Sequence, residues 1–157
     1  MGRIMIKINI VCVGNLKDKE YSSLAEEYQK RLSRFAKINV VELKEKNSLS
    51  NINQIIESET ADILQNIDVS KTVLLDKDGE LVSSPELASF VDKWSNNNSE
   101  LTFVIGGSYG VSDYLRQNAT KKISFGRMTF PHRLARIMLL EQIYRAFTIN
   151  NNISYHK

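Results

Sequence analysis

The sequence predicts an α/β fold in which helices cover both faces of a mainly parallel β-sheet. Two observations predict it. Apolar strand-like runs alternate with amphipathic helix-like segments along the chain, and the runs are almost continuously apolar, as in strands buried on both faces. The 157 residues are the size of one ordinary domain, and no repeat or compositional change marks a boundary. We therefore expect a single domain spanning residues 1–157.

The first half of the chain contains two predicted strands and two predicted helices. The strands are Ile6–Val13 and Ile38–Leu43. Between them Asp18 is placed to cap a helix, whose apolar face comprises Leu24, Ala25, Tyr28, Leu32 and Phe35. Residues 44–50 are polar and aperiodic, which predicts a mobile loop. The second helix follows, with an apolar face of Ile52, Ile55, Ile56, Ile63, Leu64 and Ile67.

The second half predicts three more strands and three more helices. Thr72–Asp76 is a strand that a turn at Asp78-Gly79 ends. Ser83–Glu86 begins a helix, because it supplies hydroxyl caps, a proline for the first turn and an acid for the dipole. The core face of that helix is Leu87, Phe90, Val91 and Trp94. The remaining strands are Leu101–Ile105 and Lys122–Ser124, and a short helix at Ser112–Ala119 lies between them. A long helix then runs from Pro131 to about Thr148. Its apolar stripe is Leu134, Ile137, Met138, Ile143 or Tyr144, and Phe147.

Composition narrows the class of protein. The chain is 42% hydrophobic and 25% charged, as in soluble globular proteins, and no apolar stretch approaches the roughly 20 residues that span a bilayer. The single cysteine, Cys12, lies in an apolar run, so we expect a buried, inert thiol rather than a nucleophile. These features favour a cytoplasmic protein without a membrane partner. Met5 directly precedes the first strand, which makes residues 1–4 a candidate dispensable extension.

Positive charge is concentrated in the last third of the chain. Residues 1–100 carry 13 Lys and Arg against 16 Asp and Glu, whereas residues 101–157 carry 8 against 2. A basic region around a ligand site favours a polyanionic partner, and RNA is the obvious one. A solvated helix face that happens to be rich in arginine is the alternative.

Two glycine-bearing loops follow neighbouring predicted strands. Gly106-Gly107 comes directly after the fourth strand, and residues 125–130 follow the fifth. The first loop matches neither the Walker nor the Rossmann pattern, and a glycine pair alone also occurs in tight turns. Two such loops at neighbouring strand ends can nevertheless hold a flat heterocycle against main-chain groups, because glycine leaves the backbone unshielded.

The two histidines do not predict a metal site. His132 and His156 have no Cys, Asp or Glu near them at ligand spacing. We expect a local hydrogen-bonding role for His132, at the first turn of the last helix. His156 lies in a tail that is either disordered or folded back over a site. Arg145 is either a surface charge or a planar group that holds a phosphate or delocalised anion.

Four segments of the sequence resemble the RlmH family, which belongs to the SPOUT class of RNA methyltransferases. They are Phe-Val-Ile-Gly-Gly-Ser-Tyr-Gly at 103–110, Ser-Phe-Gly-Arg-Met-Thr-Phe-Pro-His at 124–132, Leu-Leu-Glu-Gln-Ile-Tyr-Arg-Ala-Phe at 139–147, and the final Tyr-His-Lys. The likeness runs from Ile6 to the last residue. It implies a SPOUT fold with a C-terminal trefoil knot, the knot and cofactor site lying within about residues 72–157.

The resemblance also implies an activity. Members of this family act as homodimers on assembled ribosomes, and they methylate the N3 imide nitrogen of a pseudouridine in helix 69 of 23S ribosomal RNA. The methyl donor is S-adenosylmethionine, and no metal is implied. The family's cofactor positions match Leu75, Gly106, Phe125, Gly126, Arg127, Met128, Thr129 and Phe130 of this chain.

The expected chemistry suggests roles for the basic and aromatic groups near the end of the chain. The imide nitrogen must lose its proton, and the resulting charge spreads onto two carbonyl oxygens. Our hypothesis is that Arg145 stabilises this charge, that His156 accepts the proton, and that Tyr155 packs on the base. Arg127, Arg133 and Arg136 are candidate phosphate contacts. Three alternatives stay open: a SPOUT enzyme for another RNA nucleotide, a non-catalytic ribosome-associated protein, and a flavodoxin-like binder of small molecules.

Overall fold

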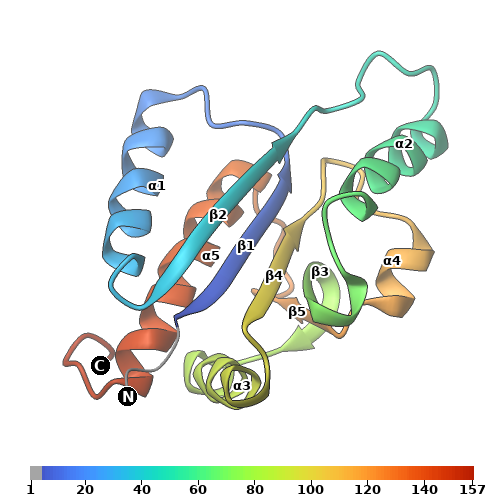
Figure 1. Cartoon of the computed structure of the whole chain (residues 1–157). Coiled ribbons are helices and arrows are strands. Elements are labelled where there is room, and N and C mark those ends of the chain that lie inside the picture. Colours follow the sequence, from blue (N-terminus) through green and yellow to red (C-terminus); the bar gives the residue numbers. More distant parts are fainter. Residues whose placement is uncertain (1–4) are drawn as a thin grey trace.

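The computed structural model describes residues 5–157 and contains one sheet of five parallel strands. Its order is β2-β1-β4-β3-β5 (Figure 1). The strands are β1 (Ile6–Val13), β2 (Ala36–Leu43), β3 (Thr72–Leu81), β4 (Glu100–Ile105) and β5 (Lys121–Ser124). The parallel α/β architecture expected from the sequence is thus confirmed. The expectation for residues 1–4 lies outside the described residues.

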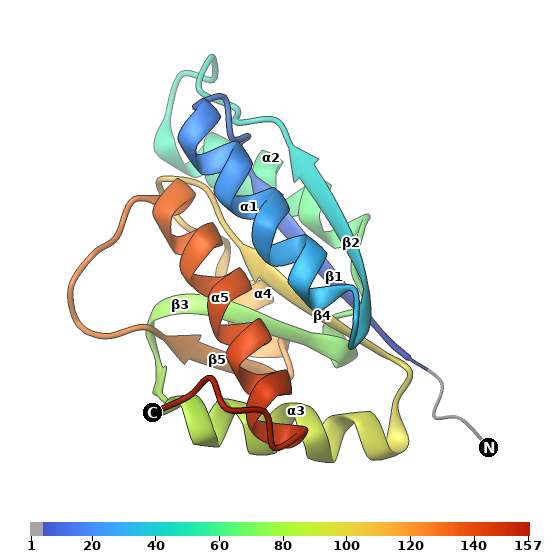
Figure 2. The ribbon, with the colours of Figure 1, turned by 90° about the vertical axis from the view of Figure 1, so that its left-hand side faces the viewer.

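Helices cover both faces of this sheet. One layer contains α1 (Lys19–Leu32), α3 (Ser84–Asn97) and α5 (His132–Asn150), and Figure 2 shows α5 lying between the other two. The opposite layer contains α2 (Ile52–Leu64) and α4 (Asp113–Asn118), with the short 3-10 helix η1 (Val69–Lys71) joining α2 to β3. None of the helices within residues 5–157 combines the length and the apolar character that a bilayer crossing requires.

Alternating side chains of the central strands divide the core in two. On β1, Ile8, Ile10 and Cys12 join the cluster under α1, α3 and α5, whereas Val11 and Val13 join the cluster under α2 and α4. This follows from the period of two in a strand, which sends successive side chains to opposite faces. The buried, inert state expected for Cys12 is confirmed: the residue is 2% exposed, and burial raises its pKa to about 11.

Two details of the helices differ from the sequence expectation. Asp18 precedes α1 at the capping position but makes no side-chain cap bond, and its carboxylate instead pairs with Arg133 at 3.2 Å. Leu24 was assigned to the buried face of α1 and is exposed, because the helix buries Ala25 and Leu32. On the second helix Ile52 is likewise exposed, and α2 ends at Leu64.

The expected turn at Asp78-Gly79 is wrong as a strand end, because β3 continues to Leu81. The pairing with β5 slips between Leu75 and Glu80, both of which lie opposite Ile123. The backbone N–H of Asp78 donates to Asp76 Oδ1 at 3.1 Å, which is the local turn that the sequence signals. Gly79 then lets β3 approach β5 again, since a Cβ there would lie 2.8 Å from the backbone of Ile123. The Asp-Gly pair therefore marks an irregularity within a strand.

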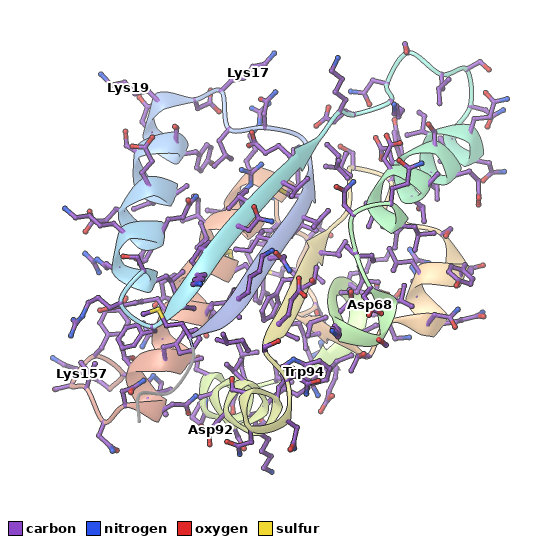
Figure 3. The ribbon with its side chains drawn as sticks, in the orientation of Figure 1. Lys17, Lys19, Asp68, Asp92, Trp94 and Lys157 are labelled. Carbon is purple, nitrogen blue, oxygen red and sulfur yellow. The ribbon has the colours of Figure 1, made fainter. Side chains whose placement is uncertain are left out.

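The start of α3 is as the sequence predicts. Ser83 Oγ accepts the backbone N–H of Glu86 at 3.2 Å, and the Glu86 carboxylate accepts the backbone N–H of Ser83 at 3.0 Å. This capping box fixes the entry of α3 beside α5. At the other end of α3, Trp94 Nε1 donates to Glu100 O at 2.7 Å, which ties the helix to the start of β4 (Figure 3).

Candidate functional site

The glycine pair after β4 forms a tight turn with little spare space. Gly110 N donates to Gly107 O at 3.0 Å, so the tight-turn interpretation holds. A Cβ at Gly106 would lie 2.8 Å from Val111 Cγ1, and one at Gly107 would lie 2.5 Å from Glu59 Oε1. A side chain at either position would therefore force Val111 or Glu59 to move.

Glu59 is a buried carboxylate behind this turn. The residue is 2% exposed, and its Oε2 accepts the backbone N–H of Lys46 at 2.9 Å. Its Oε1 has no hydrogen-bond partner within the described residues. Burial raises the pKa of this carboxyl above its ordinary value, against the lowering effect of the Lys46 N–H. Its neighbour Thr60 accepts the backbone N–H of Ser112 at 3.0 Å, so α2 supports both ends of the loop between β4 and α4.

The second glycine loop, residues 125–131, begins at the end of β5. Ser124 Oγ bonds both the N–H and the carbonyl of Gly126, at 3.2 and 2.8 Å, which closes a compact turn. Gly126 has φ 135°, a conformation that side chains rarely adopt, and nothing lies within 4 Å of the position of a Cβ. Beyond it Arg127, Met128 and Thr129 are exposed, whereas Phe125 and Phe130 are half-buried.

The far end of this loop is fixed beside β1. His132 Nε2 lies 3.3 Å from Glu45 Oε1, and the imidazole lies so close to Gly14 that a Cβ on Gly14 would be 2.8 Å from His132 Cε1. His132 thus contacts groups that are distant in the sequence, and the local hydrogen-bonding role expected for it stays a prediction. Since the strand order is β1-β4-β3-β5, residues 125–131 connect the end of β5 to the end of β1.

Of the three arginines expected to contact phosphate, Arg136 is buried, whereas Arg127 and Arg133 reach the surface. Arg136 is 5% exposed, donates to Glu42 Oε2 at 2.7 Å and to Gly14 O at 3.0 Å, and therefore anchors α5 to the sheet instead of facing RNA. Arg133 is half-exposed and pairs with Asp18. Arg127 is exposed and makes no hydrogen bond or ion pair with any residue in the described part of the chain.

A cavity of about 380 Å³ lies on the face covered by α1, α3 and α5. The cavity is open to solvent and mostly apolar, and part of its wall is formed by Ile123 of β5 and by Phe125, the first residue of the 125–131 loop. Its lining is Leu24, Tyr28, Val82, Ser83, Ser84, Leu87, Ile123, Phe125, Ile137, Met138, Glu141 and Gln142. Phe125 and Glu141 thus share one hollow, although they belong to different elements.

The C-terminal tail folds back along α5 (Figure 2). Asn152 takes φ 57°, its N–H bonds Ile149 O at 3.2 Å, and Ile153 N–H bonds Thr148 O at 2.9 Å. This is a Schellman motif with asparagine in the left-handed position, which ends the helix and reverses the chain. Of the two alternatives for the tail, the folded one is therefore present.

The reversed tail brings three predicted catalytic residues together around Glu141. Glu141 Oε1 accepts Arg145 Nε at 2.9 Å, Arg145 Nη2 at 2.6 Å and the Tyr155 hydroxyl at 3.1 Å. The remaining Arg145 nitrogen, Nη1, lies 3.1 Å from His156 Nδ1. The guanidinium also lies over the Tyr155 ring at 4.7 Å, and Tyr144 meets that ring edge-on at 4.9 Å.

This cluster controls the ionisation of its members. Burial, and then the hydrogen bond to Glu141, raise the pKa of Tyr155 to about 12, so the phenol stays neutral at physiological pH. The hydrogen bond to Glu141 raises the pKa of Arg145 above its ordinary value. Both groups are therefore hydrogen-bond donors to the Glu141 carboxylate.

The predicted cofactor residues are not all brought into contact. Phe125 reaches the cavity, and Leu75 is half-buried on β3 opposite Ile123, which also lines it. Gly106 lies at the end of β4, with no hydrogen bond to residues 125–130 in the part of the chain that is described. Sequence reasoning assigned no role to Glu141, although a Glu four residues before Arg145 on one helix face is a recognisable ion-pair signal. Within residues 5–157 no group of three or more His, Cys, Asp or Glu could hold a metal ion.

Comparison with known families decides the class. A family model described as predicted SPOUT methyltransferase matches residues 6–156, nearly the whole chain. The chain belongs to the SPOUT methyltransferase family. A solved structure, that of a probable methylase family protein from Haemophilus influenzae, shares the fold at a TM-score of 0.56 with 14% identity, over 97% of this chain and 71% of the other.

Three curated relatives of this SPOUT methyltransferase are named ribosomal RNA large subunit methyltransferase H. The chain is 42% identical to the protein of Fusobacterium nucleatum, over 97% of this chain and 100% of that one. It is 42% identical to the protein of Caldicellulosiruptor saccharolyticus and 46% identical to that of Mycoplasmopsis synoviae, in each case over 96% of this chain and 99% of the relative. The family likeness that the sequence suggested is confirmed over nearly the whole chain.

Proposed function

We propose that this chain is an S-adenosylmethionine-dependent methyltransferase that modifies the N3 imide nitrogen of a pseudouridine in helix 69 of 23S ribosomal RNA on the assembled ribosome. The observation that carries the proposal is the end-to-end likeness to relatives named as large-subunit ribosomal RNA methyltransferases, which includes the tail. The concentration of positive charge in residues 101–157 supports an RNA substrate. Members of this family that act on RNA need such a surface to hold phosphates.

The residues at the two glycine loops fit the donor. Gly126 leaves main-chain groups uncovered at the carboxyl end of β5, and the space around it is open. Gly106 supplies the backbone at the carboxyl end of β4. Leu75, Phe125 and Phe130 supply half-buried apolar surface for an adenine or a methionine chain, and Arg127, Met128 and Thr129 complete the loop. The donor would thus be held chiefly by backbone and apolar contacts, and no metal is required.

When bound, S-adenosylmethionine supplies a methyl group whose bond to the sulfonium sulfur breaks as the nitrogen–carbon bond forms. Most of the rate gain then comes from positioning, and the chain must also take the imide proton. In the structure Arg145 Nη1 lies 3.1 Å from His156 Nδ1, and because a guanidinium can only donate, we assign Nδ1 as the accepting nitrogen of the pair. We infer that the pair opens when the base enters. Opening frees Nδ1 to accept the proton and the guanidinium N–H to hold the carbonyl oxygen of the imide anion.

A homodimer, a single domain spanning residues 1–157 and a C-terminal trefoil knot belong to the same proposal. The exposed apolar side chain of Leu24, which lines the cavity, is compatible with a contact to a second copy of the chain. Light scattering of the purified protein checks the oligomeric state: a monomeric mass at micromolar concentration would contradict the dimer.

The test of the proposal is nucleoside analysis by mass spectrometry of 23S ribosomal RNA. Ribosomes from a strain that lacks the corresponding gene are incubated with the purified chain and S-adenosylmethionine, and N3-methylated pseudouridine in helix 69 is the expected product. A methyl group on a different nucleotide would favour another SPOUT specificity. Absence of cofactor binding by calorimetry at millimolar donor would favour a non-catalytic ribosome-associated protein. A flavodoxin-like binder is disfavoured, because that fold has the order 2-1-3-4-5 whereas this sheet exchanges β3 and β4.

A further inference from the structure

We propose that Glu141 is a positioning residue of this active site: its carboxylate holds Arg145 and Tyr155 in one arrangement at the edge of the cavity that Phe125 lines. The inference rests on the proposed function, since Arg145, Tyr155 and His156 are the residues assigned to the chemistry. Glu141 itself would touch neither the donor nor the nucleotide. Its role would be to set the direction of groups that do.

A single carboxylate oxygen of Glu141 accepts three hydrogen bonds. Oε1 accepts two N–H groups of Arg145 and the hydroxyl of Tyr155, all within 3.1 Å. The two charged side chains are largely shielded from water, with 18% of Glu141 and 24% of Arg145 exposed. Charge-assisted bonds in such a setting are stronger and more directional than surface ion pairs. The carboxylate therefore defines where both partners lie.

The same contact decides which edge of the guanidinium remains for chemistry. Nε and Nη2 of Arg145 are committed to Glu141, which leaves Nη1 as the nitrogen that faces His156. The Tyr155 ring is held on its face by the guanidinium and at its edge by Tyr144, and its hydroxyl is held by Glu141. Tyr155 directly, and His156 through Arg145, are thus held by one carboxylate on the helix before them.

Glu141 is in turn fixed from the cavity side. Gln142 Nε2 donates to Glu141 Oε2 at 2.8 Å, and Ser84 Oγ donates to Gln142 Oε1 at 2.6 Å. Ser84 is the first residue of α3, directly after the capping box at Ser83. A continuous set of hydrogen bonds therefore runs from the start of α3 across the cavity wall to the tail. It links the side of the cavity lined by Phe125 with the groups assigned to proton transfer.

The experiment is Glu141→Gln, which keeps the length of the side chain and removes its charge. We expect the turnover number to fall by about 10 to 100-fold, the loss that a weakened pair of charge-assisted hydrogen bonds produces. The dissociation constant for S-adenosylmethionine and the KM for ribosomes should stay within twofold of the wild type. Asp62→Asn is the matched control, because it removes one carboxylate of an ion pair, with Lys46 at 3.2 Å, on the opposite face of the sheet.

Two further readouts distinguish positioning from general support of the fold. The phenol of Tyr155, followed by NMR of ring-labelled tyrosine, should titrate closer to its ordinary pKa of 10 in Glu141→Gln than its value of about 12 in the wild type. In an Arg145→Gln background the Glu141→Gln change should cost almost nothing further, since it acts through that arginine. Additive losses would contradict the proposal.

The outcomes separate this inference from the proposed function. If Glu141→Gln turns over as fast as the wild type, the inference is overturned and the methyltransferase proposal stays intact. The same holds if Glu141→Gln loses affinity for S-adenosylmethionine to the same extent as it loses turnover. Failure of the wild-type chain to methylate helix 69 would instead remove the proposed function. If Glu141→Gln does not fold, Tyr155→Phe removes only the hydroxyl that bonds Glu141. Unchanged turnover in that variant would overturn the inference equally.

Discussion

Replacing Arg136 by methionine should destabilise the fold and leave RNA binding unaffected. The guanidinium is 5% exposed and bonds Glu42 and the carbonyl of Gly14. Removing one partner of a fully buried ion pair costs about 3–5 kcal/mol, but the Glu42 side chain is 43% exposed, so water can replace part of what it loses. The carbonyl of Gly14 has no such substitute and loses about 1–3 kcal/mol. We therefore expect a loss of about 2–4 kcal/mol in the free energy of unfolding.

Urea denaturation followed by circular dichroism measures this loss. With a slope near 2 kcal/mol per molar urea, the midpoint should fall by about 1 to 2 M. Ribosome binding is measured in parallel over a range of salt concentrations at a temperature where the variant is folded. The slope of log affinity against log salt should not change, because Arg136 faces no phosphate.

Arg127→Met is the matched control, since Arg127 is exposed and unpaired among the described residues. Its stability should stay within about 0.5 kcal/mol of the wild type. Its salt slope should decrease by roughly 0.7 to 0.9, the value for one lost phosphate contact. The reasoning is refuted if Arg136→Met is as stable as the wild type and if its ribosome affinity depends less steeply on salt concentration.

Three further predictions follow from single features. Gly79→Ala should cost about 1–3 kcal/mol in a thermal melt, because its Cβ meets the backbone of Ile123 at 2.8 Å and β3 must separate from β5; an unchanged melt would contradict this. The pKa of Cys12 is raised from 9.0 in the unfolded chain to about 11 in the folded protein, so folding favours the neutral thiol. The stabilising effect of the buried thiol on the fold is therefore complete below pH 9, and about 2 to 3 kcal/mol of it is lost as pH rises through 11. Urea titrations at pH 8 to 11 should show a shallower fall in Cys12→Ala, and equal slopes would sink the assignment. Deleting residues 155–157 should abolish turnover while calorimetry shows donor binding largely intact; full activity would remove the tail from the mechanism.

Local signals in the sequence predict local structure well here. The Ser-Ser-Pro-Glu segment at 83–86 folds into the expected capping box because all of its partners lie within three residues of one another. The tight turn at the glycine pair after β4, where Gly110 N–H bonds Gly107 O, is likewise one of the two local readings that the sequence offers. The five strands are predictable from their apolar runs.

Features that depend on distant partners were not predictable. In the sequence Arg136 looks like its neighbour Arg133, and only the fold places Glu42 and the Gly14 carbonyl against it. Gly79 reads as a turn residue, yet its role is set by the backbone of β5, more than 40 residues later. The asparagines at 150–152 suggest a flexible approach to the tail. Instead Asn152 ends α5 and reverses the chain, because an asparagine tolerates the left-handed conformation at low cost.

The geometry of α5 determines which part of the site the tail of the same chain can serve. From Asn150 back to His132 the helix axis runs roughly 27 Å, at 1.5 Å for each residue. His156 is six residues beyond Asn150 and can reach at most about 22 Å even when fully extended. It therefore cannot reach the level of His132 and Gly14, where the 125–131 loop ends. In the structure His156 lies 3.1 Å from Arg145, and its neighbour Tyr155 bonds Glu141, halfway along the helix. Within its own chain the tail lies beside the cavity that Glu141 and Phe125 line. If the tail of the same chain supplies the proton acceptor, the reacting atoms lie at the level of Glu141. A reaction above the carboxyl end of β1 would instead require the tail of a second copy.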